Sequence, residues 1–310
     1  MVAAALPDGL DAAQSAFSHG RADDALRVIN TALQTDDENA AAWNLQCRVY
    51  LAQGRWDEAV TSCRRAVQIA PSSSEYHLWL GRAYGEKASR SSMLAAYQTA
   101  KLAHAEFESA AALDGQNLEA LSDLGEYYVK APRMLGGGYG KAEALAQRLN
   151  SLDPARAYEL RAALDEAKGD YVGAEQNWRA RIAASQSSQE AAAHAWMDLG
   201  SFYRRRGRTD EMLAALESGA AADTNHGPAL VDGALTLIES GRESQLAAQW
   251  LREYLHGNAL SDTAPAFAVH AQLGGLLKKL GDVPAAEREF AAARALSANY
   301  AGTSAISAGD

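Results

Sequence analysis

The sequence is poor in cysteine, proline and aromatic residues, and it has too few cations to balance its acids. Of its 310 residues, two are cysteine, seven are proline and 7% are aromatic. Two cysteines are too few for a disulfide-rich scaffold or a four-cysteine zinc site. The net charge is −10, and such a surface repels phosphate backbones. We therefore expect neither a disulfide-rich domain nor a general nucleic-acid-binding protein.

Long apolar segments are also absent. No run of apolar residues approaches the ~18 that a membrane-spanning helix needs. The segment from Met1 to Leu6 is too short to be the apolar region of a secretory signal peptide. We expect a protein that does not insert into membranes. Its compartment stays open: the cytoplasm is the default, and the periplasm or the exterior follows if a signal peptide was removed.

The sequence lacks the motifs of catalysis, metal binding and cofactor binding. The seven histidines are scattered, and no G-x-S-x-G nucleophile turn occurs. The segment LGGGYGKA at residues 135–142 partly resembles a phosphate-binding loop. However, Leu135 and Ala142 occupy positions where that motif needs Gly and Ser or Thr. We expect a non-catalytic protein with no cofactor and no metal, and a long turn at these glycines.

What the sequence does contain is a repeat. Glycines expected at short turns between helices recur, and two of the intervals between them are 34 residues long. Small residues stand seven positions before these glycines, and large residues often stand nine positions after them. This pattern predicts pairs of antiparallel helices whose backbones approach closely at the small residues. The turn glycines are Gly20, Gly54, Gly169, Gly207, Gly241 and Gly281.

The most regular unit, residues 40–73, resembles the tetratricopeptide repeat. The residues that match its signature are Trp43, Tyr50, Gly54, Ala59, Ala66 and Pro71. Gln46 and Cys47 replace the Leu-Gly pair of the family. Residues 195–207 match the first half of the signature with Trp196, Leu199, Gly200 and Tyr203. The resemblance implies an all-α, right-handed superhelical solenoid of about eight antiparallel helix-pair repeats.

We expect a single solenoid over residues 1–300, followed by a flexible tail at 301–310. Its units are expected to start near residues 6, 40, 74, 118, 155, 193, 227 and 267. Two insertions interrupt the repeat. Residues 85–100 are expected to lengthen the helices of the third unit, and residues 131–140 are expected to replace a short turn.

In proteins of this family, the first helix of each unit lines a concave groove that binds partners. The resemblance therefore assigns partner contacts to Asn44, Arg48, Arg82, Glu126, His194, Met197, Arg204, Arg205, Val231, Leu235, Ile238, Lys278 and Lys279. The groove as a whole is expected to be acidic in the middle of the chain and basic, with an apolar strip, toward the C-terminus. Its acidic part comes from Glu126 together with Glu119, Glu159 and Glu166. The second half suits a peptide with an apolar residue beside carboxylates.

We expect a non-catalytic scaffold or adaptor that binds another protein or an extended peptide, in keeping with the family. Two alternatives stay open. The chain could self-assemble into a homo-oligomer through weakly capped ends, or it could be an accessory subunit or enzyme with a site near residues 131–141. The excess of Arg over Lys and the abundance of Ala are typical of a GC-rich bacterial genome.

The two cysteines face one another across a predicted helical hairpin. The favoured interpretation of Cys47 and Cys63 is a pair of buried thiols packed in the core. A disulfide is the alternative, and it would indicate an oxidising compartment.

Overall fold

The computed structural model describes residues 9–302, and this part of the chain is helical. It contains sixteen α-helices and a short 3-10 helix. The β-type pairing in residues 9–302 is one isolated bridge, between Ser261 and Ala264. None of the described helices is both long and apolar enough to cross a bilayer. The predicted start near residue 6 and most of the predicted tail lie outside the described residues.

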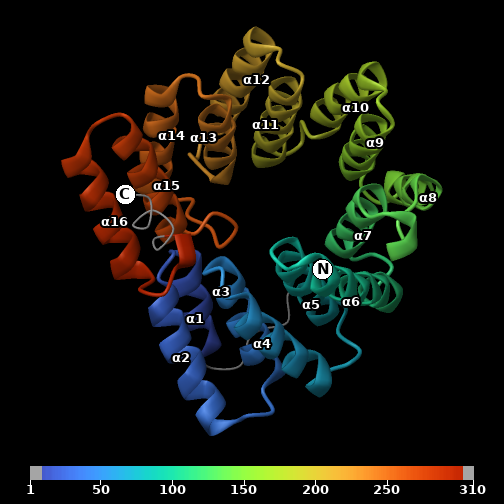
Figure 1. The fold of residues 1–310 in the computed structure, drawn as a ribbon, viewed down its shortest axis with the longest axis vertical. Coiled ribbons are helices and arrows are strands. Elements are labelled where there is room, and N and C mark those ends of the chain that lie inside the picture. Colours follow the sequence, from blue (N-terminus) through green and yellow to red (C-terminus); the bar gives the residue numbers. More distant parts are fainter. Residues whose placement is uncertain (1–8, 303–310) are drawn as a thin grey trace. The chain divides into compact units, whose positions relative to one another are not determined.

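The helices follow one another as antiparallel pairs, about eight in number, so the predicted all-α repeat fold is confirmed (Figure 1). They divide into two compact units. The terminal unit combines residues up to Arg55 with those from Gln189 onward, and the internal unit spans Trp56–Ser188.

The terminal unit contains α1 (Leu10–Ser18), α2 (Ala22–Thr35), α3 (Ala40–Ala52), α11 (Gln189–Arg205), α12 (Thr209–Ala222), α13 (Pro228–Ser240), α14 (Ser244–His256), α15 (Ala266–Lys279) and α16 (Val283–Leu296). The internal unit contains α4 (Trp56–Ile69), α5 (Ser74–Ser89), α6 (Met93–Leu113), α7 (Leu118–Lys130), η1 (Arg133–Leu135), α8 (Tyr139–Asn150), α9 (Pro154–Lys168) and α10 (Tyr171–Ala184).

The turn glycines behave as the repeat predicted. All six follow the first helix of a pair and have a positive φ, between 68° and 86°. This left-handed conformation costs a non-glycine residue roughly 1–2 kcal/mol, whereas glycine adopts it freely. Glycine at these points therefore ends one helix and reverses the chain into the next.

Small residues let the two helices of a pair approach closely. A Cβ on Gly200 of α11 would lie 2.5 Å from Leu216 of α12, and a Cβ on Gly274 of α15 would lie 2.5 Å from Phe290 of α16. These are the small and large positions, seven before and nine after the turn glycine, that the pattern placed opposite one another. The predicted packing within pairs is confirmed.

The core of the terminal unit joins residues from both ends of the chain. Phe267, in the first turn of α15, is fully buried and belongs to one cluster with Leu10 and Phe17 of α1 and Ile29 of α2. Helices α2 and α16 are in contact, as the blue and red ribbons in Figure 1 show. The first helix pairs therefore bury apolar surface against the last pair as well as against their sequence neighbours.

Hydrogen bonds reinforce this contact, which we call the seam. Asp262, in the loop between α14 and α15, pairs with Arg48 of α3 and accepts a 3.4 Å bond from Gln14 of α1. Gln53 donates a 3.0 Å bond to Ser297, and both side chains are fully buried. The repeat pattern contains no sign of the seam, because its residues stand more than two hundred positions apart in the sequence.

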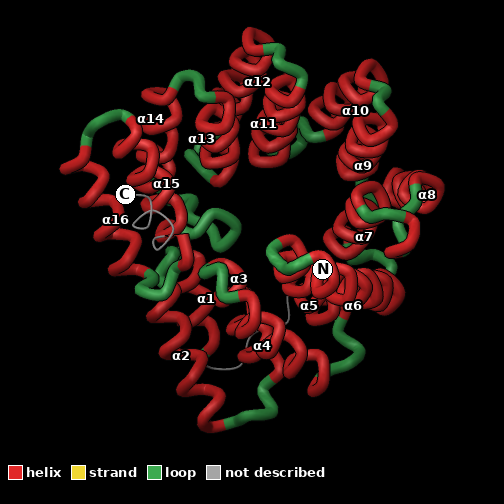
Figure 2. Tube along the Cα trace, in the orientation of Figure 1, coloured by secondary structure: helices red, strands yellow, loops and turns green. Residues whose placement is uncertain are grey.

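Both segments predicted as insertions fall in the internal unit. Helices α5 and α6 have 16 and 21 residues. Between α7 and α8 the chain forms the glycine loop, residues 131–138, which includes η1. Figure 2 shows this loop in green between its two helices.

Both cysteines are disulfide-bonded. Cys47 lies on α3 and Cys63 on α4, and the described residues include no free cysteine. The favoured expectation of two buried thiols is therefore wrong, and the alternative is correct. Spacing could not decide between them because core packing and a disulfide both bring two such positions together. A bond that closes a loop of about 15 residues stabilises a fold by about 3 kcal/mol.

Candidate partner-binding surface

All predicted contact residues lie on the first helices of their pairs. They are Asn44 and Arg48 on α3, Arg82 on α5, Glu126 on α7, His194, Met197, Arg204 and Arg205 on α11, Val231, Leu235 and Ile238 on α13, and Lys278 and Lys279 on α15. The helix assignment made from the repeat is therefore right for every one of them. Their exposure differs widely.

Three of them are core residues. Asn44 and Val231 are each 4% exposed, and Met197 is 1% exposed. Met197 packs against Gly219 of α12 and Gly233 of α13, where the missing side chains leave room for its sulfur and methyl group. A partner cannot reach these three side chains without unpacking the helices, so they do not belong to the candidate surface.

Several polar candidates are bonded to the next first helix of the terminal unit. His194 Nδ1 donates to Asp232 at 2.9 Å, and Arg204 lies 2.8 Å from Glu239. These bonds link α11 to α13, and the Glu239 carboxylate balances the charge of Arg204. Together with the 2.8 Å bond between the Ser201 and Thr236 hydroxyls they form a ladder along the two helices.

The internal unit repeats this arrangement between α5 and α7. The Arg82 guanidinium donates a 2.6 Å bond to Asp123 and lies 3.0 Å from Glu119. Burial alone would lower the pKa of Arg82, but its bond to Asp123 and the two carboxylate charges outweigh burial and raise it. Glu126 pairs with Lys130 one turn later. Arg82 therefore links two helices of the stack, whereas the Glu126 pair lies within α7.

The acidic partners of these side chains were not predicted from the sequence. They stand about one repeat later in the chain, since the bonded residues are 38 positions apart for His194 and 41 for Arg82. A search for opposite charges separated by roughly one repeat could have found them. Reading each repeat alone could not, because each bond joins two successive repeats.

The remaining candidates at the C-terminal side are accessible. Arg205 of α11 and Lys278 and Lys279 of α15 are exposed, whereas Leu235 and Ile238 of α13 are half-buried. The cations occupy the same place in their repeats, two or three residues before the turn glycine. Cations at helix C-termini also interact favourably with the helix dipole, which by itself accounts for part of this pattern.

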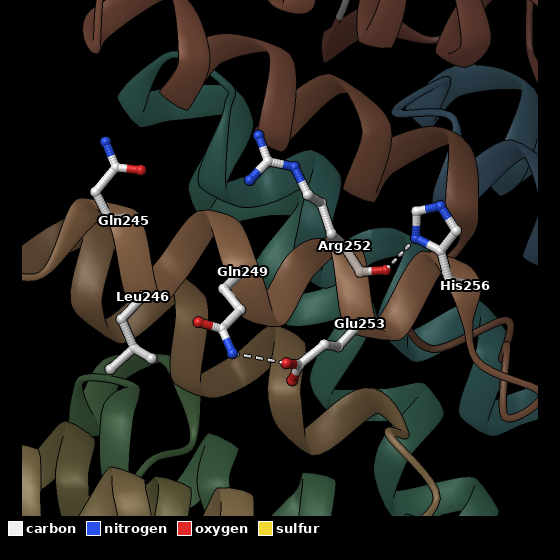
Figure 3. Close-up of a pocket in the computed structure, with 6 residues that line it drawn as sticks. All are labelled: Gln245, Leu246, Gln249, Arg252, Glu253 and His256. Atoms are coloured by element: carbon white, nitrogen blue, oxygen red, sulfur yellow. Dashed lines mark hydrogen bonds between the residues drawn. The ribbon is translucent and has the colours of Figure 1, made fainter.

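An open hollow lies on α14, away from the predicted residues. It is lined by Gln245, Leu246, Gln249, Arg252, Glu253 and His256. Figure 3 shows Gln249 pointing toward Glu253, to which it donates a 2.8 Å bond. His256 Nδ1 donates to the backbone carbonyl of Arg252 at 2.7 Å. These bonds within one helix involve three of the polar side chains and assemble no reactive group among the residues that line the hollow.

The glycine loop has the packing of a tight turn rather than of a phosphate site. A Cβ on Gly137 would overlap the carbonyl oxygen of Ala131. The Lys141 ammonium, which resembled a phosphate ligand in the sequence, donates a 3.0 Å bond to the carbonyl of Gly136. Among the described residues, no group of His, Cys, Asp and Glu side chains could hold a metal ion.

Comparisons with known proteins agree with this architecture. A family model described as tetratricopeptide repeat matches residues 10–74. The structure of TTC0263, a thermophilic TPR protein of Thermus thermophilus, is 18% identical and aligns with a TM-score of 0.51, covering 68% of this chain and all of that one. A tetratricopeptide repeat protein from Parabacteroides merdae is 15% identical with a TM-score of 0.51, covering 87% of this chain and 96% of that one. No curated protein sequence matches this chain.

At these identities the two structures establish the fold and nothing about partners. The family match covers the first two helix pairs, and the same turn glycines and close helix crossings continue beyond them. Residues 10–74 therefore match the tetratricopeptide-repeat family model, and the described helix pairs share the fold of these two tetratricopeptide-repeat structures.

Proposed function

We propose that the protein is a non-catalytic scaffold that binds an acidic, partly apolar segment of another protein on the first helices of its terminal unit. The observation that carries this proposal is the exposure of Arg205 on α11 and of Lys278 and Lys279 on α15, at equivalent positions of their repeats. The first helix of the intervening repeat, α13, carries the half-buried Leu235 and Ile238. Guanidinium and ammonium groups bind carboxylates, and the two apolar side chains can accept an apolar residue. The fold is commonly a protein-interaction scaffold.

The test uses peptides of defined chemistry. A fluorescein-labelled peptide of alternating Glu and Leu is compared with its Lys and Leu counterpart by fluorescence anisotropy, at low and high salt. We expect the acidic peptide to bind with a Kd of about 1 μM, which is about −8 kcal/mol. High salt should weaken binding because exposed charges are screened.

Arg205→Glu is the variant of choice, because the Arg205 side chain is exposed whereas Arg204 is half-buried. We expect Arg205→Glu to weaken the acidic peptide about fivefold, which is about 1 kcal/mol. Arg252→Glu reverses an exposed cation on the second helix of a pair and is the matched control. Equal binding by both variants, with unchanged helicity, would refute the assignment of this face.

Self-assembly through the chain ends is a weaker candidate. It requires the outer faces of the first and last repeats to be open, yet Phe267 of the last pair is buried among residues of α1 and α2. A second copy would have to displace the seam before it could stack on either face. Sedimentation at several concentrations tests this, and a mass that rises with concentration would favour self-assembly.

A site near the glycine loop is also a weaker candidate. Titratable side chains do converge there, including His104, Glu108 and Lys141. However, Gly136 lies so close to the His104 ring that a Cβ on it would be 2.7 Å from Nδ1. This leaves no room for a substrate above the imidazole, so we do not propose catalysis at this place.

We propose further that the protein works in an oxidising compartment, because its cysteines are disulfide-bonded and such bonds persist mainly outside the reducing cytosol. Thiol labelling of the protein in intact cells tests this. Rapid labelling of both cysteines without prior reduction would contradict it.

A further inference from the structure

A histidine is enclosed by aromatic rings in the internal unit. His104 of α6 stacks on Tyr127 of α7, with ring centroids 4.9 Å apart and planes 12° from parallel. The ring of Tyr128 meets it edge-on at 5.8 Å. The His104 side chain is 16% exposed, so most of its ring is removed from water.

The glycine loop covers the remaining face of this ring. A side chain on Gly136 would collide with the imidazole, so the backbone itself lies against it. The Tyr127 hydroxyl donates a 2.7 Å bond to the carbonyl of Leu135. The Gly138 amide donates a 2.9 Å bond to the carbonyl of Tyr128. The loop is thus held directly over His104 by the two tyrosines that flank the ring.

Of His104 and the two tyrosines that pack against it, only His104 can titrate near neutral pH. Burial, with the charge of Glu108, raises the pKa of Tyr128 to about 12 and the pKa of Tyr127 above its ordinary value, so both stay neutral. Glu108, on the same helix, places Oε1 3.2 Å from His104 Nε2. The Lys141 ammonium of α8 lies 4.8 Å from the centre of the Tyr128 ring. The last residue of η1, Leu135, contributes the backbone carbonyl that accepts the Tyr127 hydroxyl bond.

The balance of these neighbours favours the uncharged imidazole. Burial is the main cause that lowers the pKa of His104, the Glu108 carboxylate opposes it, and the Lys141 ammonium adds to it. A proton on the ring would create a cation that is stacked between a tyrosine and a backbone turn and shielded from water. Such a cation is solvated only if the covering backbone moves away.

We propose that His104 is a pH-sensitive latch for the glycine loop: the neutral ring holds the loop against α6 and α7, and protonation of the ring releases it. One proton is taken up from solvent for each loop that opens. Release uncovers the imidazole and the faces of Tyr127 and Tyr128. This function is separate from the partner surface of the terminal unit and does not depend on it.

The experiment measures amide hydrogen exchange of the full chain at pH 7.5 and pH 5.0, corrected for the intrinsic dependence of exchange on pH. The amide of Gly138 is the reporter, because its bond to Tyr128 exists only while the loop is closed. We expect its protection to fall about tenfold for each unit by which the pKa of His104 differs between the closed and open loop. Equal protection at both pH values would overturn the proposal.

Two variants separate the latch from general acid instability. His104→Phe keeps an aromatic stack but cannot titrate, so protection of Gly138 should no longer depend on pH. His256→Gln changes an exposed histidine of the terminal unit and should leave the pH response intact. A pH response that survives His104→Phe would refute the latch.

A conservative variant and a direct titration keep the proposal testable if His104→Phe does not fold. Glu108→Gln removes the carboxylate that favours the imidazolium, so loop release should move to lower pH. In the wild-type protein, the His104 ring is titrated by NMR. A pKa at or above the ordinary value of about 6.5, or release in Glu108→Gln at the same or higher pH, would overturn the proposal.

Discussion

The terminal unit and the internal unit close their cores in different ways. In the terminal unit, α1 and α2 bury their apolar side chains against Phe267 of α15, which is far away in the sequence. The internal unit is one continuous segment of the chain. Its irregular glycine loop packs on α6 and α7, the two helices that directly precede it in the sequence. The comparison shows that one repeat pattern can be completed by distant or by local contacts.

The two units also differ in the pKa of a histidine that has an acidic neighbour: it is raised for His194 in the terminal unit and lowered for His104 in the internal unit. The hydrogen bond to Asp232 is the main cause that raises the pKa of His194, and the charges of Asp232, Asp198 and Glu190 add to it against the effect of burial. Burial lowers the pKa of His104, and Glu108 does not offset it. A carboxylate near a histidine therefore does not fix the direction of its pKa. The hydrogen-bond geometry and the burial of the ring decide it.

The largest expected effect comes from removing the distant contact of the terminal unit. Phe267→Ala should destabilise the fold by about 3–5 kcal/mol, because it leaves a cavity in a fully buried cluster. Thermal unfolding measures the loss, and hydrogen exchange shows where protection is lost. We expect α1 and α2 to lose protection although the substitution is in α15.

The control for this prediction is Phe290→Ala in the same helix pair. Phe290 is also buried, but it packs at Gly274 within the pair. Its removal should weaken α15 and α16 more than α1 and α2. If Phe267→Ala leaves the protection of α1 and α2 unchanged, the seam does not stabilise the first helices.

The next effect concerns the local contact of the internal unit. Gly137→Ala places a Cβ on the carbonyl oxygen of Ala131, so the loop backbone must move. We expect a loss of about 1–3 kcal/mol, measured by urea unfolding. Gly140→Ala is the matched control, because a Cβ there meets nothing within 4 Å. It should be neutral or stabilise α8 by up to about 1 kcal/mol. Equal destabilisation by both variants would contradict the close packing of the loop.

The smallest expected effect is the change in the pH dependence of the free energy of unfolding when either histidine is replaced. His194 has a raised pKa, so its stabilising contribution is complete below about pH 6.5 and is lost as the pH rises through its folded-state value. His104 has a lowered pKa, so stability should fall as the pH drops below about 6.5. His194→Gln should therefore cost stability at pH 5.5, by less than about 1 kcal/mol, and should cost less at pH 9.

The matching variant, His104→Gln, should reduce the acid-induced loss of stability instead. Urea unfolding at both pH values measures the two variants. If His104→Gln and His194→Gln change stability with the same dependence on pH, the described neighbours do not control these protons.

Much of the fold could be predicted because its signals are local. The turn glycines and the small residue opposite a large one fix each hairpin within about one repeat, as at Gly200 and Leu216. The candidate surface was predicted less well. Met197 and Val231 were assigned to the correct helices but lie in the core. One position along a helix turns a side chain by about 100°, so a small error in register exchanges surface for core.

The sequence by itself determined that this chain forms helix pairs, where they turn and which faces pack within a pair. Those features depend on backbone conformation and on apolar spacing within one repeat. Only the tertiary structure decided that Phe267 completes the N-terminal core, that the cysteines are bonded, and that His104 and His194 differ in proton affinity. These properties depend on how close side chains come across repeats or across the chain ends. Such distances are set by the packing of the whole fold, which no single repeat specifies.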